Sequence, residues 1–182
     1  MTKFDKNKNA VFISDLSSED CIHQLFDKCN LFDPVSIYVY IDSYGGNVYY
    51  GNIIGHYLNH KFENIHCCCS GKIMSAAFQL FWMLKGSKEI LDISVGMDHL
   101  CYITVDMMNI GLFKDHASSL TYIENITTYN ELWMKYTKQI LGYTQKQTST
   151  IKNGKDLTFT SSQLCGLLKN YEKNNQKSFA LY

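Results

Sequence analysis

A serine, a histidine and an aspartate are the residues of this chain whose types could together perform nucleophilic chemistry. Ser75 lies at the start of an almost wholly apolar segment, shortly after Gly71. A serine hydroxyl is a weak nucleophile at neutral pH, so it needs a base that a third group holds in place. His99 is the candidate base, and Asp156, in a polar loop, is the candidate orienting carboxylate.

Each of these residues also has an ordinary structural interpretation. A lone serine at a helix start is more often an N-cap or a small packing residue than a nucleophile. His99 is one of 6 histidines, and Asp156 alone would be a solvated loop residue. Weaker candidates for the acid are Asp98, Asp106 and Asp115. From the residues alone, both interpretations stay open.

A glycine turn follows the most strongly apolar strand candidate. Residues 37–41 are apolar, and most are β-branched or aromatic, which is typical of a buried strand. Gly45 and Gly46 then break the pattern, and residues 49–61 resume with helical spacing. In open α/β folds such strand-to-helix junctions are where ligands and substrates bind.

Strands and helices alternate along the whole chain, which predicts right-handed β-α-β units in one α/β domain over residues 1–182. Residues 1–9 form a short N-terminal segment, and residues 169–182 a polar tail. Ser17 or Ser18 is expected to cap the first helix, and Thr160 the last. A turn is predicted at 70–72. The predicted strands are 10–13, 37–41, 65–69, 89–93 and 100–105, and the predicted helices are 21–29, 49–61, 73–84, 118–146 and 161–168.

Composition excludes several classes of function. Lys plus Arg and Asp plus Glu each number 17, so broad binding to nucleic acid or to an anionic membrane is not expected. No apolar run approaches the roughly 20 residues of a membrane span, and the N-terminus has no apolar signal core. We therefore expect a cytoplasmic or other intracellular protein. No phosphate-binding glycine loop is present, so neither ATP nor another cofactor is expected.

The cysteines indicate neither a metal site nor a disulfide framework. Cys67, Cys68 and Cys69 are consecutive among 7 cysteines. In a strand they would alternate between faces, so they cannot converge on one metal ion. An odd count without a signal peptide argues against a disulfide framework. We expect small residues of a buried strand.

Several segments, in order, resemble the proteolytic subunit of the Clp protease, the ClpP family of serine peptidases. Residues 37–51 resemble the strand and glycine turn of that family, with Tyr44 where the family has proline. Gly71 and Ser75 keep the spacing of its nucleophile segment, and residues 91–99 resemble the segment that leads to its histidine. Residues 130–137 resemble its protruding handle helix, and 155–167 its acid segment. The match extends over about residues 10–168.

The resemblance implies a ClpP/crotonase-like fold of stacked β-α-β units with a handle helix, and a triad of Ser75, His99 and Asp156. The backbone N–H groups of Gly46 and Ala76 would form the oxyanion hole. A peptide substrate would lie as an added strand along the segment that contains Asn47 and Val48, opposite the strand that begins near Leu100.

The resemblance also implies partners. Heptameric rings, stacked in pairs in the family's manner, would enclose a chamber that admits unfolded or short peptides, and a Clp-type ATPase unfoldase would feed it. The short N-terminal segment leaves little of the family's axial segment that meets the ATPase. One alternative is a ring subunit without activity that assembles with an active paralogue. Another is a virus-encoded relative that acts on capsid or host proteins.

Overall fold

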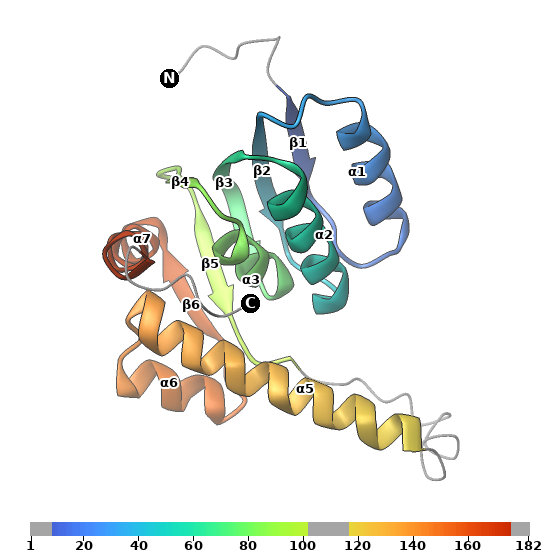
Figure 1. Cartoon of the computed structure of the whole chain (residues 1–182). Coiled ribbons are helices and arrows are strands. Elements are labelled where there is room, and N and C mark those ends of the chain that lie inside the picture. Colours follow the sequence, from blue (N-terminus) through green and yellow to red (C-terminus); the bar gives the residue numbers. More distant parts are fainter. Residues whose placement is uncertain (1–8, 102–116, 176–182) are drawn as a thin grey trace. The chain divides into compact units, whose positions relative to one another are not determined.

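The computed structural model describes residues 9–101 and 117–175, and it contains a mixed β-sheet (Figure 1). Within the described residues the sheet has 6 strands. Five of them follow the order β1-β2-β3-β5-β6. The remaining strand, β4, pairs with residues 66–69 of β3, and β5 pairs with residues 72–74 of the same strand. All pairs are parallel except β5 with β6. The strands are β1 Ala10–Ile13, β2 Ser36–Ser43, β3 Asn64–Met74, β4 Ser87–Ile90, β5 Val95–Asp98 and β6 Leu157–Thr160. The predicted α/β class is confirmed.

The chain divides into two compact units. The first comprises residues 1–98 and 156–166, and it holds the sheet. The second comprises residues 99–155 and 167–182. The first unit contains the helices α1 Asp20–Asn30, α2 Val48–Lys61 and α3 Ala76–Met83. The second contains α5 Ala117–Tyr136, the π-helical turn η2 Thr137–Leu141 and α6 Gln145–Lys152. Helix α7 Ser161–Asn175 begins in the first unit and continues in the second.

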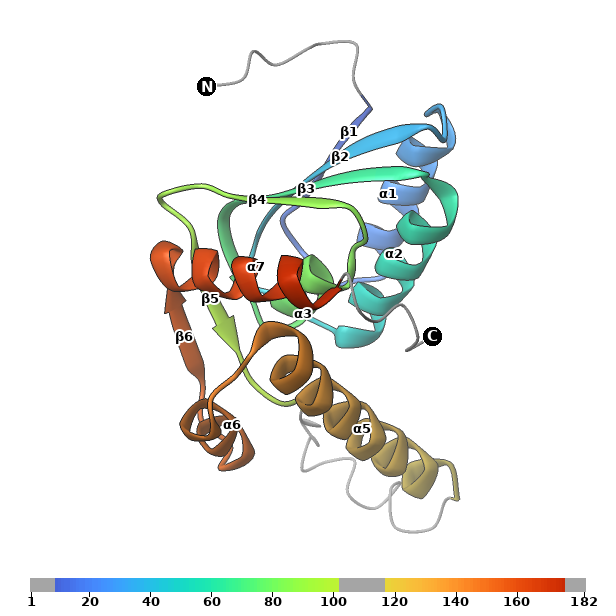
Figure 2. The ribbon, with the colours of Figure 1, turned by 60° about the vertical axis from the view of Figure 1, so that its left-hand side comes forward.

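Helices α1, α2 and α3 all lie on one face of the sheet (Figure 2). The strand residues that point to this face are buried, and those of β1 and β2 are Val11, Ile13, Ile37, Val39 and Ile41. The alternate residues are accessible: Phe12 is 63% exposed, and its ring stacks on that of Tyr40 at 5.0 Å. This alternation is the pattern of a sheet with one covered face.

Helix α3 lies inside the core of the first unit. Phe78, Phe81 and Trp82 are buried, and the ring of Phe78 stacks on that of Phe159 at 5.5 Å. A helix that is apolar on all sides is one surrounded by protein. The apolar character of residues 76–83 therefore reflects packing around the helix, which holds its N-terminus in a fixed place.

Strand β3 is longer than the sequence predicts, and the predicted turn at 70–72 is wrong. These residues continue β3 to Met74, and α3 begins only at Ala76. The predicted serine cap of α1 is also wrong. Glu19 occupies the N-cap position without a side-chain hydrogen bond, and Ser17 Oγ donates instead to Asp15 at 2.8 Å.

The second half of the chain departs further from prediction. The strands β5 and β6 were not predicted, and the helix predicted over 118–146 is divided into α5, η2 and α6. The predicted Thr160 cap is confirmed, because Gln163 N–H donates to Thr160 Oγ1 at 3.4 Å. The predicted strand 100–105 lies mostly outside the described residues. Helix α7 extends to Asn175, so the described part of the predicted tail is helical.

No helix in the described ranges combines the length and the apolar character that a membrane crossing requires.

Candidate active site

Ser75 is the single residue between β3 and α3, and its backbone is strained. Its φ is 54° and its ψ is −126°, and among the described residues it alone has a positive φ without being glycine. These angles match the first central residue of a type II′ turn, a position that glycine dominates. Such backbone costs about 1–3 kcal/mol for other residues. A strained strand-to-helix turn is also the geometry that exposes the nucleophilic serine of α/β hydrolases.

Backbone hydrogen bonds fix Ser75 from both sides. Its N–H donates to the Met97 carbonyl of β5 at 2.8 Å, and its C=O accepts from Gln79 of α3 at 3.2 Å. The side chain is half-buried and makes no capping hydrogen bond to α3. The sequence predicted Ser75 inside the first helical turn. The structure places it one residue earlier, where the hydroxyl is not used as a cap.

The glycine turn between β2 and α2 packs directly against Ser75. Gly45 has a φ of 99° and Gly46 a φ of 140°, so both lie where glycine is favoured. A Cβ on Gly45 would lie 2.8 Å from Ser75 Cβ and 3.1 Å from the Ala76 nitrogen. Only glycine therefore permits this approach, which brings the turn, the serine and the start of α3 together.

The two predicted oxyanion donors, Gly46 and Ala76, belong to this arrangement. The recorded hydrogen bonds of the turn are Gly45 N–H to Ser43 Oγ at 3.0 Å, Leu16 N–H to Gly45 C=O at 3.2 Å and Asn47 N–H to Leu16 C=O at 2.8 Å. None of these three uses the Gly46 N–H. Ala76 opens α3, and the first amides of a helix have no carbonyl partner within it. Amide N–H groups of this kind can donate hydrogen bonds to an oxygen atom that develops negative charge.

The predicted substrate edge is only partly extended. Asn47 is extended and caps α2, since its side chain accepts the Tyr49 N–H at 2.9 Å. Val48 is the first residue of α2. An added strand along this edge would therefore meet ordinary extended backbone at Asn47, and helix beyond it.

His99 begins the second unit, directly after the last residue of β5. Its Nδ1 lies 2.7 Å from the Leu100 carbonyl oxygen. A carbonyl can only accept a hydrogen bond, so in the neutral ring this contact places the proton on Nδ1 and not on Nε2. That is the tautomer a general base requires, and here the backbone of Leu100 favours it.

Asp156 belongs to the first unit and is exposed. It directly precedes Leu157, and Leu157 pairs with Asp98, the residue before His99. Within the described residues, no hydrogen bond or ion pair of the Asp156 carboxylate is found. The structure thus groups Ser75 with Gly45 and Ala76, whereas the joining of the three triad residues stays a prediction.

Asp98 is the buried carboxylate nearest to His99 in the chain. It is 0% exposed at the end of β5, whereas Asp156 is exposed. Burying a carboxylate is costly unless neighbours compensate its charge or hydrogen-bond it. Burial therefore makes Asp98 a stronger competitor for the acid role than the sequence suggested.

Thiol chemistry is disfavoured at the three consecutive cysteines. All of them are buried in β3, as predicted. Burial raises the pKa of Cys67 to about 12 and that of Cys68 to about 11. The thiolate is the nucleophile and the metal ligand, so these groups are inert at neutral pH. In the described part of the chain no group of three or more His, Cys, Asp or Glu residues could hold a metal ion.

Sequence reasoning missed two charged residues beside the site. Asp42 lies three residues before Gly45, and Lys72 three residues before Ser75, and their side chains form an ion pair of 3.2 Å. A signal was present, since Asp42 ends the apolar run 37–41 and Lys72 stands directly before Ile73, each next to a predicted site segment. Their interaction is long-range in sequence, so spacing alone did not reveal it.

No protein-family model matches the sequence, and no curated protein matches it significantly.

Proposed function

We propose that this chain is a serine peptidase of the ClpP type, with a ClpP/crotonase-like fold and Ser75 as its nucleophile. The observation that carries the proposal is the strained Ser75 backbone at the junction of β3 and α3, with the glycine turn against it. The strain is compatible with a serine kept for its hydroxyl, because glycine would suit this backbone better. The segment order that resembles the ClpP family supports the same reaction.

In the proposed reaction Ser75 Oγ attacks the carbonyl carbon of a peptide bond. His99 Nε2 takes the hydroxyl proton and returns it to the leaving amine. The N–H groups of Gly46 and Ala76 hold the oxyanion. Water then hydrolyses the acyl-enzyme by the same route. Removing one oxyanion donor typically costs about a hundred- to a thousand-fold in kcat.

The acid is the least supported member of the proposed triad. Asp156 is the first candidate by resemblance, and Asp98 is the second by burial. The Leu100 carbonyl already favours the required tautomer of His99. Comparing Asp156→Asn with Asp98→Asn assigns the role, because loss of the orienting acid lowers kcat by about ten-thousand-fold. Equal, small losses in both variants would mean that the Leu100 carbonyl orients the ring alone.

The decisive experiment is hydrolysis of a panel of short fluorogenic peptides without ATP or a partner. Ser75→Ala should abolish the activity, and Ser18→Ala, which removes an exposed hydroxyl, should retain it. A fluorophosphonate probe should label the unaltered chain at Ser75, as peptide mass spectrometry would show. Hydrolysis that survives Ser75→Ala would refute the proposal.

Assembly follows from the same proposal. Heptameric rings, stacked in pairs, would enclose the active sites, so that only unfolded or short polypeptides reach them; a Clp-type ATPase unfoldase is the proposed partner, in a cytoplasmic or other intracellular compartment. Native mass spectrometry should give seven- or fourteen-fold multiples of the 21.0 kDa chain. A monomer at micromolar concentration would contradict the ring.

A second candidate function is that of a ring subunit with little or no activity beside an active paralogue. The exposed Asp156, which has no recorded bond within the described residues, favours this alternative. Such a subunit would form rings but resist the fluorophosphonate probe. Labelling of Ser75 would exclude it.

A further inference from the structure

Strand β3 contains a bulge just before the candidate nucleophile. The register pairs on its two sides are Ile41 with Cys69 and Ser43 with Ile73. Two steps along β2 thus correspond to four along β3, and the extra residues lie between Cys69 and Ile73. Bulges of this kind re-aim the following residues and are common beside active sites.

The bulge is also where β3 changes its neighbour. Cys69 pairs with Ile90 of β4, and Lys72 pairs with Val95 of β5. The β5 pairing continues to Met97, whose carbonyl accepts the Ser75 N–H. The shape of the bulge therefore decides how Ser75 meets β5.

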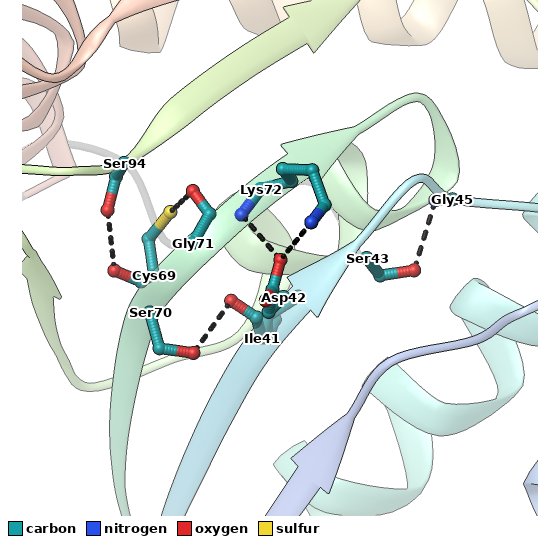
Figure 3. Close-up of polar contacts among 9 residues, drawn as sticks. All are labelled: Ile41, Asp42, Ser43, Gly45, Cys69, Ser70, Gly71, Lys72 and Ser94. Carbon is teal, nitrogen blue, oxygen red and sulfur yellow. Dashed lines mark hydrogen bonds and ion pairs between the residues drawn. The ribbon is translucent and has the colours of Figure 1, made fainter.

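The carboxylate of Asp42 of β2, an exposed side chain, lies against the bulge and contacts Lys72 (Figure 3). Its Oδ1 accepts the Lys72 backbone N–H at 2.8 Å, and the Lys72 ammonium lies 3.2 Å from the same oxygen. A Cβ on Gly71 would lie 2.6 Å from this oxygen. Glycine at position 71 thus leaves the space that the Asp42 carboxylate occupies.

Two serines anchor the other side of the bulge. Ser70 Oγ donates to the Ile41 carbonyl at 3.2 Å, and the buried Ser94 donates to the Cys69 carbonyl at 2.8 Å (Figure 3). Both bonds end on strand carbonyls next to the irregular stretch. Together with Asp42 they provide partners for backbone groups that a regular ladder would otherwise satisfy.

The same charged pair reaches the glycine turn. The Lys72 ammonium lies 4.8 Å from the ring centroid of Tyr44, within the range of a cation–π contact. Ser43, next to Asp42, accepts the Gly45 N–H at 3.0 Å. Tyr44 stands where the resemblance to the ClpP family places proline, so its φ is not fixed by a ring. Its side chain is 71% exposed, and the contact with the Lys72 ammonium is a weak restraint there.

We propose that Asp42 and Lys72 are positioning residues, which together with the space at Gly71 form a brace that holds the glycine turn in register with Ser75. On this view the carboxylate shapes the bulge that directs Ser75, and the ammonium restrains Tyr44 before Gly45. Neither side chain takes part in bond making. The catalytic part of this inference rests on the proposed peptidase function.

Gly71→Ala is the sharpest perturbation, because it keeps both charged residues in the sequence while the added Cβ forces the Asp42 carboxylate to move. Asp42→Asn keeps an oxygen acceptor and removes the charge, and Lys72→Met removes only the ammonium. Lys72→Arg restores a cation with a similar reach. Gly166→Ala is the matched control, since a Cβ there would meet no atom within 4 Å.

In peptide hydrolysis, we expect Gly71→Ala to lower kcat by about ten- to a hundred-fold, short of the full loss of an oxyanion donor. KM should change less than kcat, because the side chains of Asp42 and Lys72 do not themselves contact the peptide and only the turn that they hold borders its proposed path. Lys72→Met should lower kcat by a smaller factor, and Lys72→Arg should recover most of it. Normal kcat in Gly71→Ala, or an equal loss in Gly166→Ala, would overturn the proposal.

Amide hydrogen exchange supplies a readout that needs no activity. Peptides that cover 43–47 should exchange faster in Gly71→Ala and Asp42→Asn than in the unaltered chain, whereas peptides from α2 should not change. If the unaltered chain hydrolyses no peptide, the proposed function fails, and exchange still decides whether the brace holds the turn. Unchanged exchange at 43–47 would refute the brace even in an active enzyme.

Discussion

Replacing Ser75 by glycine should stabilise the fold while it removes the candidate nucleophile. Ser75→Gly and Ser75→Ala both delete the hydroxyl, so they differ only in how their backbones tolerate a φ of 54° and a ψ of −126°. Glycine adopts such angles freely, whereas alanine keeps the Cβ that causes the strain. The comparison between these two variants therefore isolates the backbone term.

The expected difference follows from two opposing effects. Strain of this kind costs a residue with a Cβ about 1–3 kcal/mol. Glycine loses more conformational freedom on folding, which costs about 0.5–1 kcal/mol relative to alanine. The glycine variant should therefore be more stable than the alanine variant by about 1 kcal/mol. For a chain of 182 residues, this corresponds to a rise of about 2–4 °C in Tm.

Urea unfolding followed by tryptophan fluorescence measures this difference where it arises. Trp82 is buried in α3, seven residues after Ser75 in the same unit, whereas Trp133 lies in the other unit. A Trp133→Phe background makes Trp82 the only reporter. Both variants should unfold with the same m value, and the glycine variant should have the higher midpoint.

An alanine variant as stable as the glycine variant would refute the reasoning. It would mean that residue 75 relaxes to ordinary backbone angles when the hydroxyl is absent, so the strain is not imposed by the surrounding strands. A change in m value would instead indicate a change in the surface exposed on unfolding, and the midpoints would then not be comparable. Gly51→Ala supplies a control for general glycine effects, because a Cβ there would make only ordinary contacts of 3.5 Å or more.

Two further predictions concern groups away from the site. Burial lowers the pKa of Lys88 to about 8 from 10.5, so the folded chain releases this proton at lower pH than the unfolded chain. Stability relative to Lys88→Met should therefore rise between about pH 8 and pH 10.5. A difference in urea midpoint between the two proteins that stays constant over this window would contradict the shift. Cys165 is exposed, whereas Cys67 and Cys69 are buried, and an exposed thiol reacts faster with dithiobis(nitrobenzoate). Cys165→Ser should therefore remove the fastest phase of labelling by this reagent. A fast phase that survives the substitution would show that another thiol is accessible.

The regular elements of the first unit were largely predictable from local pattern. The first strand was predicted at 10–13 and is β1, because a short apolar run bounded by polar residues has few other interpretations. Helix α2 begins one residue before its predicted start, where Asn47 supplies the cap. Both signals lie within the element itself or directly beside it.

The errors around β3 and β5 come from interactions that are distant in the sequence. Residues 70–72 have the composition of a turn, yet Asp42 accepts the Lys72 N–H and Lys72 pairs with Val95 of β5, which keeps them in the sheet. Strand β5 contains Gly96, which usually argues against a strand interior. A Cβ there would lie 2.8 Å from the Leu164 side chain, so the tight packing of α7 selects glycine. No local pattern contains these constraints.

The site was predictable in its residue types but not in its geometry. The serine and the glycine turn were candidates from the residues themselves, and Ala76 was added by the resemblance to the ClpP family. The structure brings them together in the first unit. The positive φ of Ser75 was not predictable, because serine gives no signal for it. The two candidates for the acid are the same residue type, so the sequence could not rank them by burial. The structure shows that Asp98 is buried and Asp156 is exposed.

At position 75 the backbone conformation favours glycine, but the residue is serine. Gly45, Gly46 and Gly86 occupy positive φ values in the same unit, so this fold does place glycine where its backbone requires it. At residue 75 the backbone has the same requirement, and the serine hydroxyl forms no capping bond to α3 that would offset the strain. Stability alone would therefore favour glycine there. A side chain kept at a cost to folding is a candidate for a task outside folding, and this cost is the ground on which Ser75 is proposed as a nucleophile.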